Sequence, residues 1–441
     1  MKIAVLGAGF TGLATSLRLL QDGHQVTLFE KENQFGGLAG GFRENSWQWS
    51  LEKSYHHFFT NDQKALNLAK EVGQEIIINR PKTDVLVNNQ ILPLDTPMAL
   101  LFFPFLPLVD KLRMGLITLY LRIINNFSQF NQIKALPWLK KYMGEKAVSL
   151  IWEPLFMGKF GKHQENISLT WFWARIKKRT TSLAYPKGGF ESFAQKLAKK
   201  IEDLGGEILL NTEVLSIGKD LTVYSLPSTA KSRSRKPASQ RGESEVGSQL
   251  SFDKIIVTLP TPTFLKISSP LPKTYSKKLS SISHLSALIL ILTLKKPFLK
   301  SKTYWLNITN PSFPFLVLTE HTNFMSPKYY GNHPILYIGN YLPEDHPYFK
   351  KTKEELLKIY EPYLKKINPF YDSGILSLHS FTQPNAQPIV NVGHDKLIPS
   401  FQTPLKNVYL ANLDMVYPWD RGVNNAIEMG EKVAKLINEQ T

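Results

Sequence analysis

The first thirty residues place apolar runs on either side of a glycine-rich turn. Residues 2–6 form a short apolar run with β-branched members, which is typical of a buried strand. Gly7 to Gly12 follow at once, and apolar residues then recur at helical spacing as far as Leu20. After Asp22-Gly23, residues 24–30 again have the pattern of a strand. The chain therefore begins with a predicted strand, tight turn, helix and second strand.

Alternating strands and helices return in the second half of the chain. Gly188-Gly189 introduces a helical pattern and Gly205-Gly206 ends it. The expected elements are a helix at 191–204, strands at 207–210, 214–217, 221–225 and 254–260, sheet strands at 287–294, 303–308, 313–319 and 335–341, a helix at 353–366, a strand at 407–412 and a closing helix at 426–438.

Residues 98–124 are the most apolar region, but they are too interrupted to form a membrane-spanning helix. A spanning helix needs about 20 consecutive, mostly apolar residues, and this region contains two prolines, Asp110 and Lys111. We expect two short helices, the second amphipathic with Arg113 and Arg122 on its polar side. They line a substrate pocket or rest on a membrane surface, and both hold together if the substrate is lipid-like.

The turn from Gly7 to Gly12 has the GxGxxG spacing of a dinucleotide-binding loop. Gly7 permits the tight turn, Gly9 lets the backbone approach a pyrophosphate, and Gly12 lets the helix pack close to the strand. The phosphates would lie on the free N–H groups at the start of the helix. Glu30, 18 residues beyond Gly12, is the expected acid for a ribose hydroxyl, and it disfavours the 2′-phosphate of NADP.

A second glycine cluster, Gly36-Gly37 with Gly40-Gly41, follows the second strand. With this pair the sequence resembles the FAD-dependent superfamily that contains amine oxidases, protoporphyrinogen oxidase, phytoene desaturases and UDP-galactopyranose mutase. The resemblance implies FAD, held where the second glycine pair crosses close to its phosphates. The cofactor-binding residues that we expect are Gly7, Gly9, Phe10, Thr11, Gly12, Glu30, Lys31, Gly37, Leu38, Val214, Asn412, Val423 and Asn424.

The expected fold class is α/β, with a Rossmann-like FAD/NAD(P)-binding domain interleaved with a mixed α+β substrate domain. A stretch rich in Ser, Arg and Lys and poor in apolar residues, 226–250, is expected to be a disordered basic insert. The expected boundaries are 1–75, 185–270 and 405–441 for the FAD-binding domain and 76–184 and 271–404 for the substrate domain, whose helical, membrane-contacting part covers 98–180.

The chain of 441 residues has a net charge of +17 and no cysteine. Residues 134–200 hold 14 Lys and Arg against 4 Asp and Glu, which favours an anionic membrane surface or a substrate that carries an anionic group. Aromatic residues do not alternate with the basic ones as in nucleic-acid-binding segments, so we expect no nucleic-acid partner. Without cysteine, redox chemistry must use a bound organic cofactor. Met1-Lys2 leads directly into the first strand, so we expect a cytoplasmic protein with peripheral contact at the inner face of the cytoplasmic membrane.

Two adjacent histidines, His56 and His57, lie in the most distinctive local cluster. On a strand their side chains would point to opposite faces, so we expect no metal site between them. In the superfamily that the chain resembles, this stretch passes near the isoalloxazine ring. We therefore take His56 and His57 as catalytic candidates, one of which hydrogen-bonds the flavin or the substrate while Phe58 packs against it. The alternative is that both are ordinary core histidines.

Residues 56–62 are similar to a run in UDP-galactopyranose mutases, whose reduced flavin N5 attacks the anomeric carbon of the sugar. The tyrosines and arginines that hold the diphosphate in those mutases have several candidates here. These candidates for the mutase set include Arg175, Tyr185, Tyr329 and Tyr330.

Amine oxidases usually carry a lysine near flavin N5 on a substrate-domain strand, and residues 287–291 contain none, which disfavours simple amine oxidation.

Over nearly its whole length the chain is similar to a bacterial group of protoporphyrinogen-oxidase-like FAD oxidoreductases. The resemblance implies an oxidase, dehydrogenase or desaturase whose flavin N5 accepts hydride from a hydrophobic or lipid-linked substrate. The alternatives are a mutase-like isomerase and a flavin-binding protein without catalysis. The segments that carry the similarity are 55–58, 152–155, 159–161, 171–179, 320–323, 386–389 and 417–424.

Overall fold

The unit of strand, turn, helix and strand at the N-terminus forms as predicted. The computed structural model describes residues 1–227, 248–268, 270–371 and 374–440. Helix α1 (Phe10–Gln21) connects β1 (Lys2–Leu6) to β2 (Gln25–Phe29), and the two strands pair in parallel. Apolar residues fill β1 because both faces of this sheet are covered.

Strands from distant segments complete the parallel sheet. Its order is β10–β2–β1–β14–β20, and every neighbouring pair is parallel. β1 therefore lies where the strand order reverses, and at such a point of an α/β sheet ligands bind beyond the carboxyl ends of the strands. The other three strands are β10 (Glu207–Leu209), β14 (Lys254–Val257) and β20 (Val408–Leu410).

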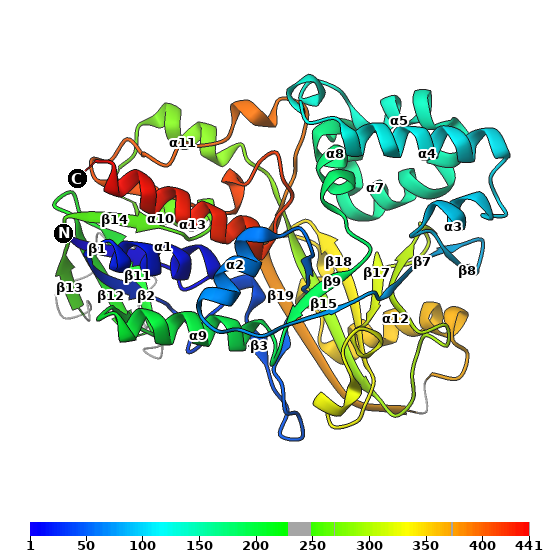
Figure 1. Ribbon diagram of the computed structural model, residues 1–441, viewed down its shortest axis with the longest axis horizontal. Coiled ribbons are helices and arrows are strands. Elements are labelled where there is room, and N and C mark those ends of the chain that lie inside the picture. The colour runs from blue at the N-terminus through cyan, green and yellow to red at the C-terminus, as the bar shows by residue number, and fades with distance from the viewer. Residues whose placement is uncertain (228–247, 269, 372–373, 441) are drawn as a thin grey trace.

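Helix α1 packs between α9 (Phe190–Asp203) and α13 (Val423–Asn438), as Figure 1 shows. The approach of α1 to α13 is close because Gly430 has no side chain: a Cβ there would lie 2.4 Å from the carbonyl oxygen of Thr11. The hydroxyl of Thr15 also donates to the carbonyl of Gly430 at 3.3 Å. The last helix of the chain is thus fixed against the first.

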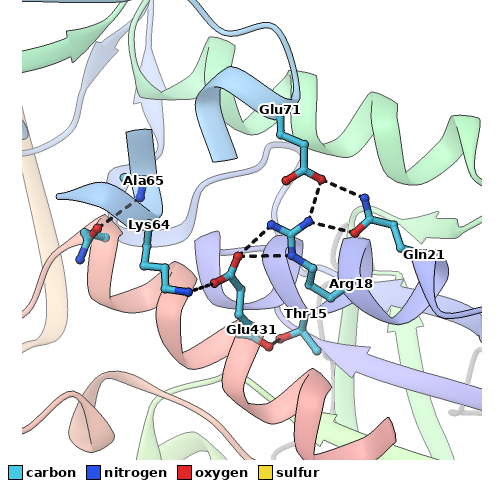
Figure 2. Close-up of polar contacts among 9 residues, drawn as sticks. Thr15, Arg18, Gln21, Lys64, Ala65, Glu71 and Glu431 are labelled. Carbon is cyan, nitrogen blue, oxygen red and sulfur yellow. Dashed lines mark hydrogen bonds and ion pairs between the residues drawn. The ribbon is translucent and has the colours of Figure 1, made fainter. Parts of the chain in front are cut away.

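Ion pairs extend this junction to α2 (Gln63–Glu71). Figure 2 shows Arg18 between Glu71 and Glu431, at 2.7 Å and 2.8 Å, with Lys64 at 2.7 Å from Glu431. These groups are partly exposed, so each pair contributes only about 0–1 kcal/mol. The network joins α1, α2 and α13, three helices that are far apart in the sequence.

A mixed sheet of seven strands forms the second layer, in the order β19–β15–β18–β17–β16–β7–β8. Helix α12 (Lys353–Ile367) begins with a capping box of Thr352 and Glu355 and packs Leu356 and Leu364 into the apolar cluster beside this sheet. The strands are β7 (Lys82–Val87), β8 (Gln90–Pro93), β15 (His284–Leu294), β16 (Thr303–Ile308), β17 (Val317–Glu320), β18 (Ile335–Leu342) and β19 (Ile375–Pro388).

The region between β8 and the return to the first layer is helical, and Figure 1 shows it gathered away from β1 and α1. Residues 98–124 give two short helices, as expected. No helix in the described ranges is long and apolar enough to cross a membrane. The helices are α3 (Pro97–Leu101), α4 (Leu108–Ile123), α5 (Ala135–Met143), α6 (Glu145–Ala147), α7 (Glu153–Phe160) and α8 (Leu169–Lys178).

Helix α4 is the second of the two helices, which we expected to be amphipathic with Arg113 and Arg122 on its polar side. It buries only Met114 and Leu121, whereas Leu116 is 65% and Ile123 67% exposed. Its two arginines turn toward neighbouring backbone: Arg113 donates to the carbonyls of Lys141 and Tyr142, and Arg122 to that of Arg179. The outer side of α4 is therefore apolar.

The two ends of the expected disordered insert, 226–250, are ordered strand. Residues 226–227 end β12 (Thr222–Pro227) and residues 248–250 begin β13 (Ser248–Ser251), and these strands pair antiparallel. The remainder of that prediction, 228–247, lies outside the described residues.

The other elements are β3 (Gly41–Phe42), β4 (Leu51–Glu52), β5 (Phe58–Phe59), β6 (Ile76–Asn79), β9 (Leu183–Pro186), β11 (Thr212–Ile217), α10 (Thr261–Ile267) and α11 (Lys273–Ser280).

The other expected elements form, most of them with shifted ends, whereas the strand expected at 303–308 has the expected bounds. Helix α13 begins three residues before the expected 426, because Gly422 serves as its N-cap. β17 starts only at Val317, since Pro314 cannot donate to a ladder. The α/β fold class, with a parallel sheet interleaved with a mixed one, is confirmed.

Candidate active site

One cavity of about 2170 Å³ connects three parts of the fold. Its first part lies at the glycine turn after β1 and at the start of α13. Its second part is lined by the adjacent histidines and by aromatic side chains from the mixed sheet. Its third part lies between α3 and α4. A ligand that fills the cavity would therefore contact both sheets and the helical region.

The glycine turn leaves backbone N–H groups free at the start of α1. Gly9 is the N-cap and offers no side chain, and the first turn of the helix contains no acidic residue. Gly9 also forms a parallel bridge with Gly36, and a Cβ on Gly37 would lie 3.2 Å from the Cα of Gly9. Two glycine turns thus meet at a helix N-terminus, an arrangement suited to phosphate.

Gly7 and Gly12 have different positions relative to the cavity. Gly7 has φ +105°, a conformation that favours glycine, and it lines the cavity. A Cβ on Gly12 would lie 1.9 Å from the carbonyl oxygen of Gly7. Gly12 is therefore placed against the backbone of the turn and does not line the cavity, whereas Phe10 and Thr11 do.

Glu30 lies at the end of β2 and faces the same end of the cavity. Its carboxylate accepts the N–H of Ala8 at 2.8 Å and that of Glu32 at 2.9 Å, and burial raises its pKa. A carboxylate accepts about four hydrogen bonds, so capacity remains for hydroxyl groups. Lys31 is exposed and lies 3.5 Å from Glu32.

Leu38, Val214, Asn412, Val423 and Asn424 also line the cavity. The Leu38 carbonyl accepts from Gln383 at 2.8 Å. The amide of Asn412 is used within the protein, since it donates to Leu259 and Thr261 and accepts from Asp414. Asn424 accepts the N–H of Ala65. The two asparagines thus position backbone, and Val423 starts α13 with its N-terminus at the cavity.

His56 and His57 do not lie on a strand, which differs from the strand on which we expected them. They belong to the loop before β5, and both line the cavity. The loop starts from Glu52, a buried carboxylate that accepts from Tyr185 and from the N–H of Phe190, and burial raises its pKa to about 7. The carbonyl of Glu52 accepts from Tyr337.

Each histidine has its own partner. Nδ1 of His56 lies 2.7 Å from the carbonyl of Ser54, which can only accept, so Nδ1 carries the proton and Nε2 has a free lone pair. Nδ1 of His57 lies 3.1 Å from the hydroxyl of Tyr304. Burial lowers the pKa of His56 to about 4 and that of His57 to about 3, so both are neutral at pH 7. Phe58 packs on Phe190 rather than on either imidazole.

Aromatic side chains that sequence reasoning missed surround the histidines. Trp305 lies 4.9 Å from Tyr55 and 6.0 Å from His57 between ring centroids, and Tyr304 and Tyr341 complete the wall. They come from β16, β18 and the loop before β5. Only the pairing of distant strands brings them together, so no local pattern identifies them.

A charged cluster adjoins this wall. Asp420 lies 2.6 Å from Arg175 and 3.9 Å from Lys159. Burial alone would raise the pKa of Asp420, but Lys159, Arg175 and Arg421 hold it well below its usual range. Burial and the charge of Arg175 lower the pKa of Lys159 far below the ordinary value.

The tyrosines considered for a mutase-like diphosphate site lie elsewhere. Tyr185 and Tyr330 are fully buried, bonded to Glu52 and His321 respectively, and Tyr329 stacks on Trp49 with centroids 3.5 Å apart. None of the three lines the cavity, whereas Arg175 does. Arg175 lies in the last turn of α8 (Leu169–Lys178), and Arg179 is the extended C-cap of that helix.

A family model described as flavin containing amine oxidoreductase matches residues 10–438. The chain belongs to the flavin-containing amine oxidoreductase family. It is therefore a flavoprotein oxidoreductase by family, and an enzyme.

Solved structures of similar fold cover the whole chain. A UDP-galactopyranose mutase has a TM-score of 0.75 at 16% identity, covering 100% of this chain and 96% of that one. A protein described as a candidate protoporphyrinogen oxidase, from Exiguobacterium sp. 255-15, has a TM-score of 0.74 at 16% identity, covering 100% and 99%. At these identities the likeness shows the fold alone.

One curated relative is similar in a short segment. The 4,4'-diapophytoene desaturase (4,4'-diaponeurosporene-forming) of Staphylococcus haemolyticus is 49% identical over 51 residues, which are 12% of this chain and 10% of that protein. The match thus spans about a tenth of that relative's length. It does not reach far enough to transfer an activity.

The partly buried, neutral histidines predict a loss of stability in acid. Below a pH of about 6.5 the unfolded chain takes up protons at His56 and His57, while the folded chain does not until about pH 4 or 3. Stability therefore falls by about 1.4 kcal/mol per pH unit for each histidine in this window. Urea unfolding of His57→Gln between pH 6.5 and 4.5 should show a shallower fall than wild type, and His333→Gln, outside the cavity, should not. Equal slopes for all three proteins would contradict the burial of neutral His57.

Proposed function

We propose that the protein binds FAD and oxidises a C–H bond of a hydrophobic or lipid-linked substrate. The observation that carries the proposal is one continuous cavity, which joins a phosphate-binding turn, a chamber with aromatic walls and an apolar entrance. Flavin, when bound, supplies a hydride acceptor at N5. The residues of this chain bind and orient both molecules and exclude water.

The residues at the glycine turns fit a dinucleotide. The N–H groups that start α1, together with Gly37, would hold the pyrophosphate, and the carboxylate of Glu30 would accept ribose hydroxyls. The start of α13 at Val423 offers a second set of free N–H groups to polar flavin atoms. We assign residues 1–75, 185–270 and 405–441 to the FAD-binding domain and 76–184 and 271–404 to the substrate domain.

The histidines would act on the reacting end of the substrate. His56 presents an unprotonated Nε2, which can accept a hydrogen bond or a proton, because its Nδ1–H is held by Ser54. Tyr304 orients the His57 ring. The surrounding aromatic rings exclude water and give the substrate an apolar contact surface.

The entrance between α3 and α4 would lie on an anionic membrane. Phe102 is 74% exposed, and Leu112, Leu116 and Leu119 are exposed and line the cavity mouth at the same time. An apolar patch of this kind on a soluble surface marks an interaction site. Basic side chains on the same helix, such as Arg122, favour anionic lipid as the occupant.

Flavin retention tests the cofactor site. A Cβ at Gly9 would meet only the Cα of Gly37, at 3.9 Å, and Gly9 has φ −71°. Gly9→Ala should therefore fold normally, while Gly9→Leu, with its bulk over the free N–H groups, should lose the flavin absorption of the purified protein. Gly12→Ala is the contrasting variant, because its Cβ would collide with Gly7 and destabilise the fold. A folded Gly9→Leu protein that keeps its full flavin spectrum would refute the assignment.

Anaerobic flavin reduction tests the reaction. A polyene or lipid-linked substrate mixed with the protein in the absence of oxygen should bleach the flavin absorption. His56→Ala should slow this bleaching by about 10²-fold or more, as expected for loss of a positioned acid–base group. Turnover of UDP-galactopyranose only after dithionite reduction would instead establish mutase chemistry.

Vesicle sedimentation tests the membrane contact. The protein should bind vesicles that contain phosphatidylglycerol and bind pure phosphatidylcholine vesicles more weakly. Leu116→Glu should weaken binding about tenfold or more, because it removes an exposed leucine that would insert into the lipid and adds a negative charge. Leu376→Glu, at an exposed leucine on β19, is the matched control. Self-association abolished by Leu116→Glu, without vesicle binding, would show that a second copy covers this face.

A further inference from the structure

The part of the cavity beside the histidines encloses an excess of positive charge. Arg175, Arg179 and Arg421 line it, and a guanidinium stays protonated in proteins. Among the described residues, Asp420 is the carboxylate that contacts this group. Lys159 lies 3.9 Å from the same carboxylate, so it does not offset the excess.

Asp420 is already used. One of its oxygens accepts from Arg175 at 2.6 Å, and the other accepts from Gln387 and from the N–H of Arg421. The guanidinium of Arg421 has acceptors of its own, the carbonyl of Ala386 and the hydroxyl of Tyr341. Arg175 and Arg421 are thus held in place by the protein.

Arg179 differs from the other two. Its guanidinium has no hydrogen-bond or ion-pair partner within residues 1–227, 248–268, 270–371 and 374–440, although its carbonyl accepts from Arg122. Burial, followed by the charge of Arg175, lowers the pKa of Arg179 to about 10. An enclosed charge without a partner is costly, whereas it binds an anion strongly when one enters.

We infer that Arg179, with Arg175 beside it, forms a subsite for a carboxylate or phosphate group of the substrate. The planar fork of a guanidinium suits both of these anions. The inference rests on the proposed function and narrows its substrate to an anionic amphiphile, a molecule with one anionic group and a long apolar part.

The apolar part of such a substrate would lie toward the entrance of the cavity between α3 and α4. Lys177 donates to the carbonyls of Arg122 and Ile123, which fixes the end of α8 against the end of α4. From Arg179 the cavity lining continues through Arg122 to the apolar side chains of α4. An anionic group at Arg179 therefore leaves the rest of the molecule facing apolar surface that opens on the exterior.

Calorimetric titration of the protein as purified, with its cofactor, tests the subsite. The probes are dodecyl phosphate, dodecanoate, dodecanol and inorganic phosphate, the first three below the concentrations at which they form micelles. Dodecyl phosphate or dodecanoate should bind at one site at least about tenfold more tightly than dodecanol, because a charge-assisted bond is added. The better of the two anions identifies the group, and inorganic phosphate should bind weakly for lack of an apolar part.

Arg179→Gln should weaken binding of the anionic amphiphile about tenfold or more and leave dodecanol binding unchanged. Arg43→Gln, at an exposed arginine outside the cavity, is the charge-matched control. The thermal midpoint of ligand-free Arg179→Gln should not fall, since the side chain makes no bond within the described chain, and a lower midpoint would indicate a structural role instead. Equal affinity for dodecanol and the anions, or an unchanged affinity in Arg179→Gln, would overturn the inference.

The binding measurement is separate from the redox measurement. A protein that binds dodecyl phosphate through Arg179, but whose flavin no lipid or polyene reduces, would refute the proposed reaction and leave the anion subsite standing. A protein whose flavin is bleached by a neutral polyene, and which does not prefer anions, would refute the subsite alone.

Discussion

The site depends on one constraint, the crossing of two stretches of backbone that carry no side chains. Gly9 and the Gly36-Gly37 pair meet at the carboxyl end of the central strand, and a Cβ on Gly37 would already lie 3.2 Å from the Cα of Gly9. This approach exposes the first N–H groups of α1 and brings Glu30 to the same place. The histidine loop, the aromatic wall and the last helix are all arranged around the cavity that begins there.

The sequence alone predicted those elements that a local pattern of residues specifies. The first strand, turn and helix, the α/β class and the two short helices of residues 98–124 follow from periodicity and glycine spacing, since each is set by neighbours along the chain. The positions of His56 and His57 were not predictable in this way. Their loop is anchored by Glu52, whose partners Tyr185, Phe190 and Tyr337 come from distant segments. Arg179 stands out only in the folded chain, because the absence of a partner is a property of tertiary structure.

Helix α4 shows why hydrophobicity alone did not settle its orientation. An apolar stripe predicts that one side of a helix is covered, but it does not indicate whether the protein core or lipid covers it. The core of the helical region takes Met114 and Leu121, and the larger apolar side remains outside. Because the same side chains form the mouth of the cavity, the surface that would bind lipid and the route to the histidines are one structure.

The order of the strands in the parallel sheet has a consequence for folding during translation. β1 and β2 are synthesised long before β20, which lies at an edge of the same sheet, and before α13, which packs on α1. Contacts between residues so far apart are slow to form, because a long loop must close before they are gained. The glycine crossing and the start of α13 therefore come together only after residues 423–438 have been synthesised, and until then the nascent chain leaves one side of α1 uncovered.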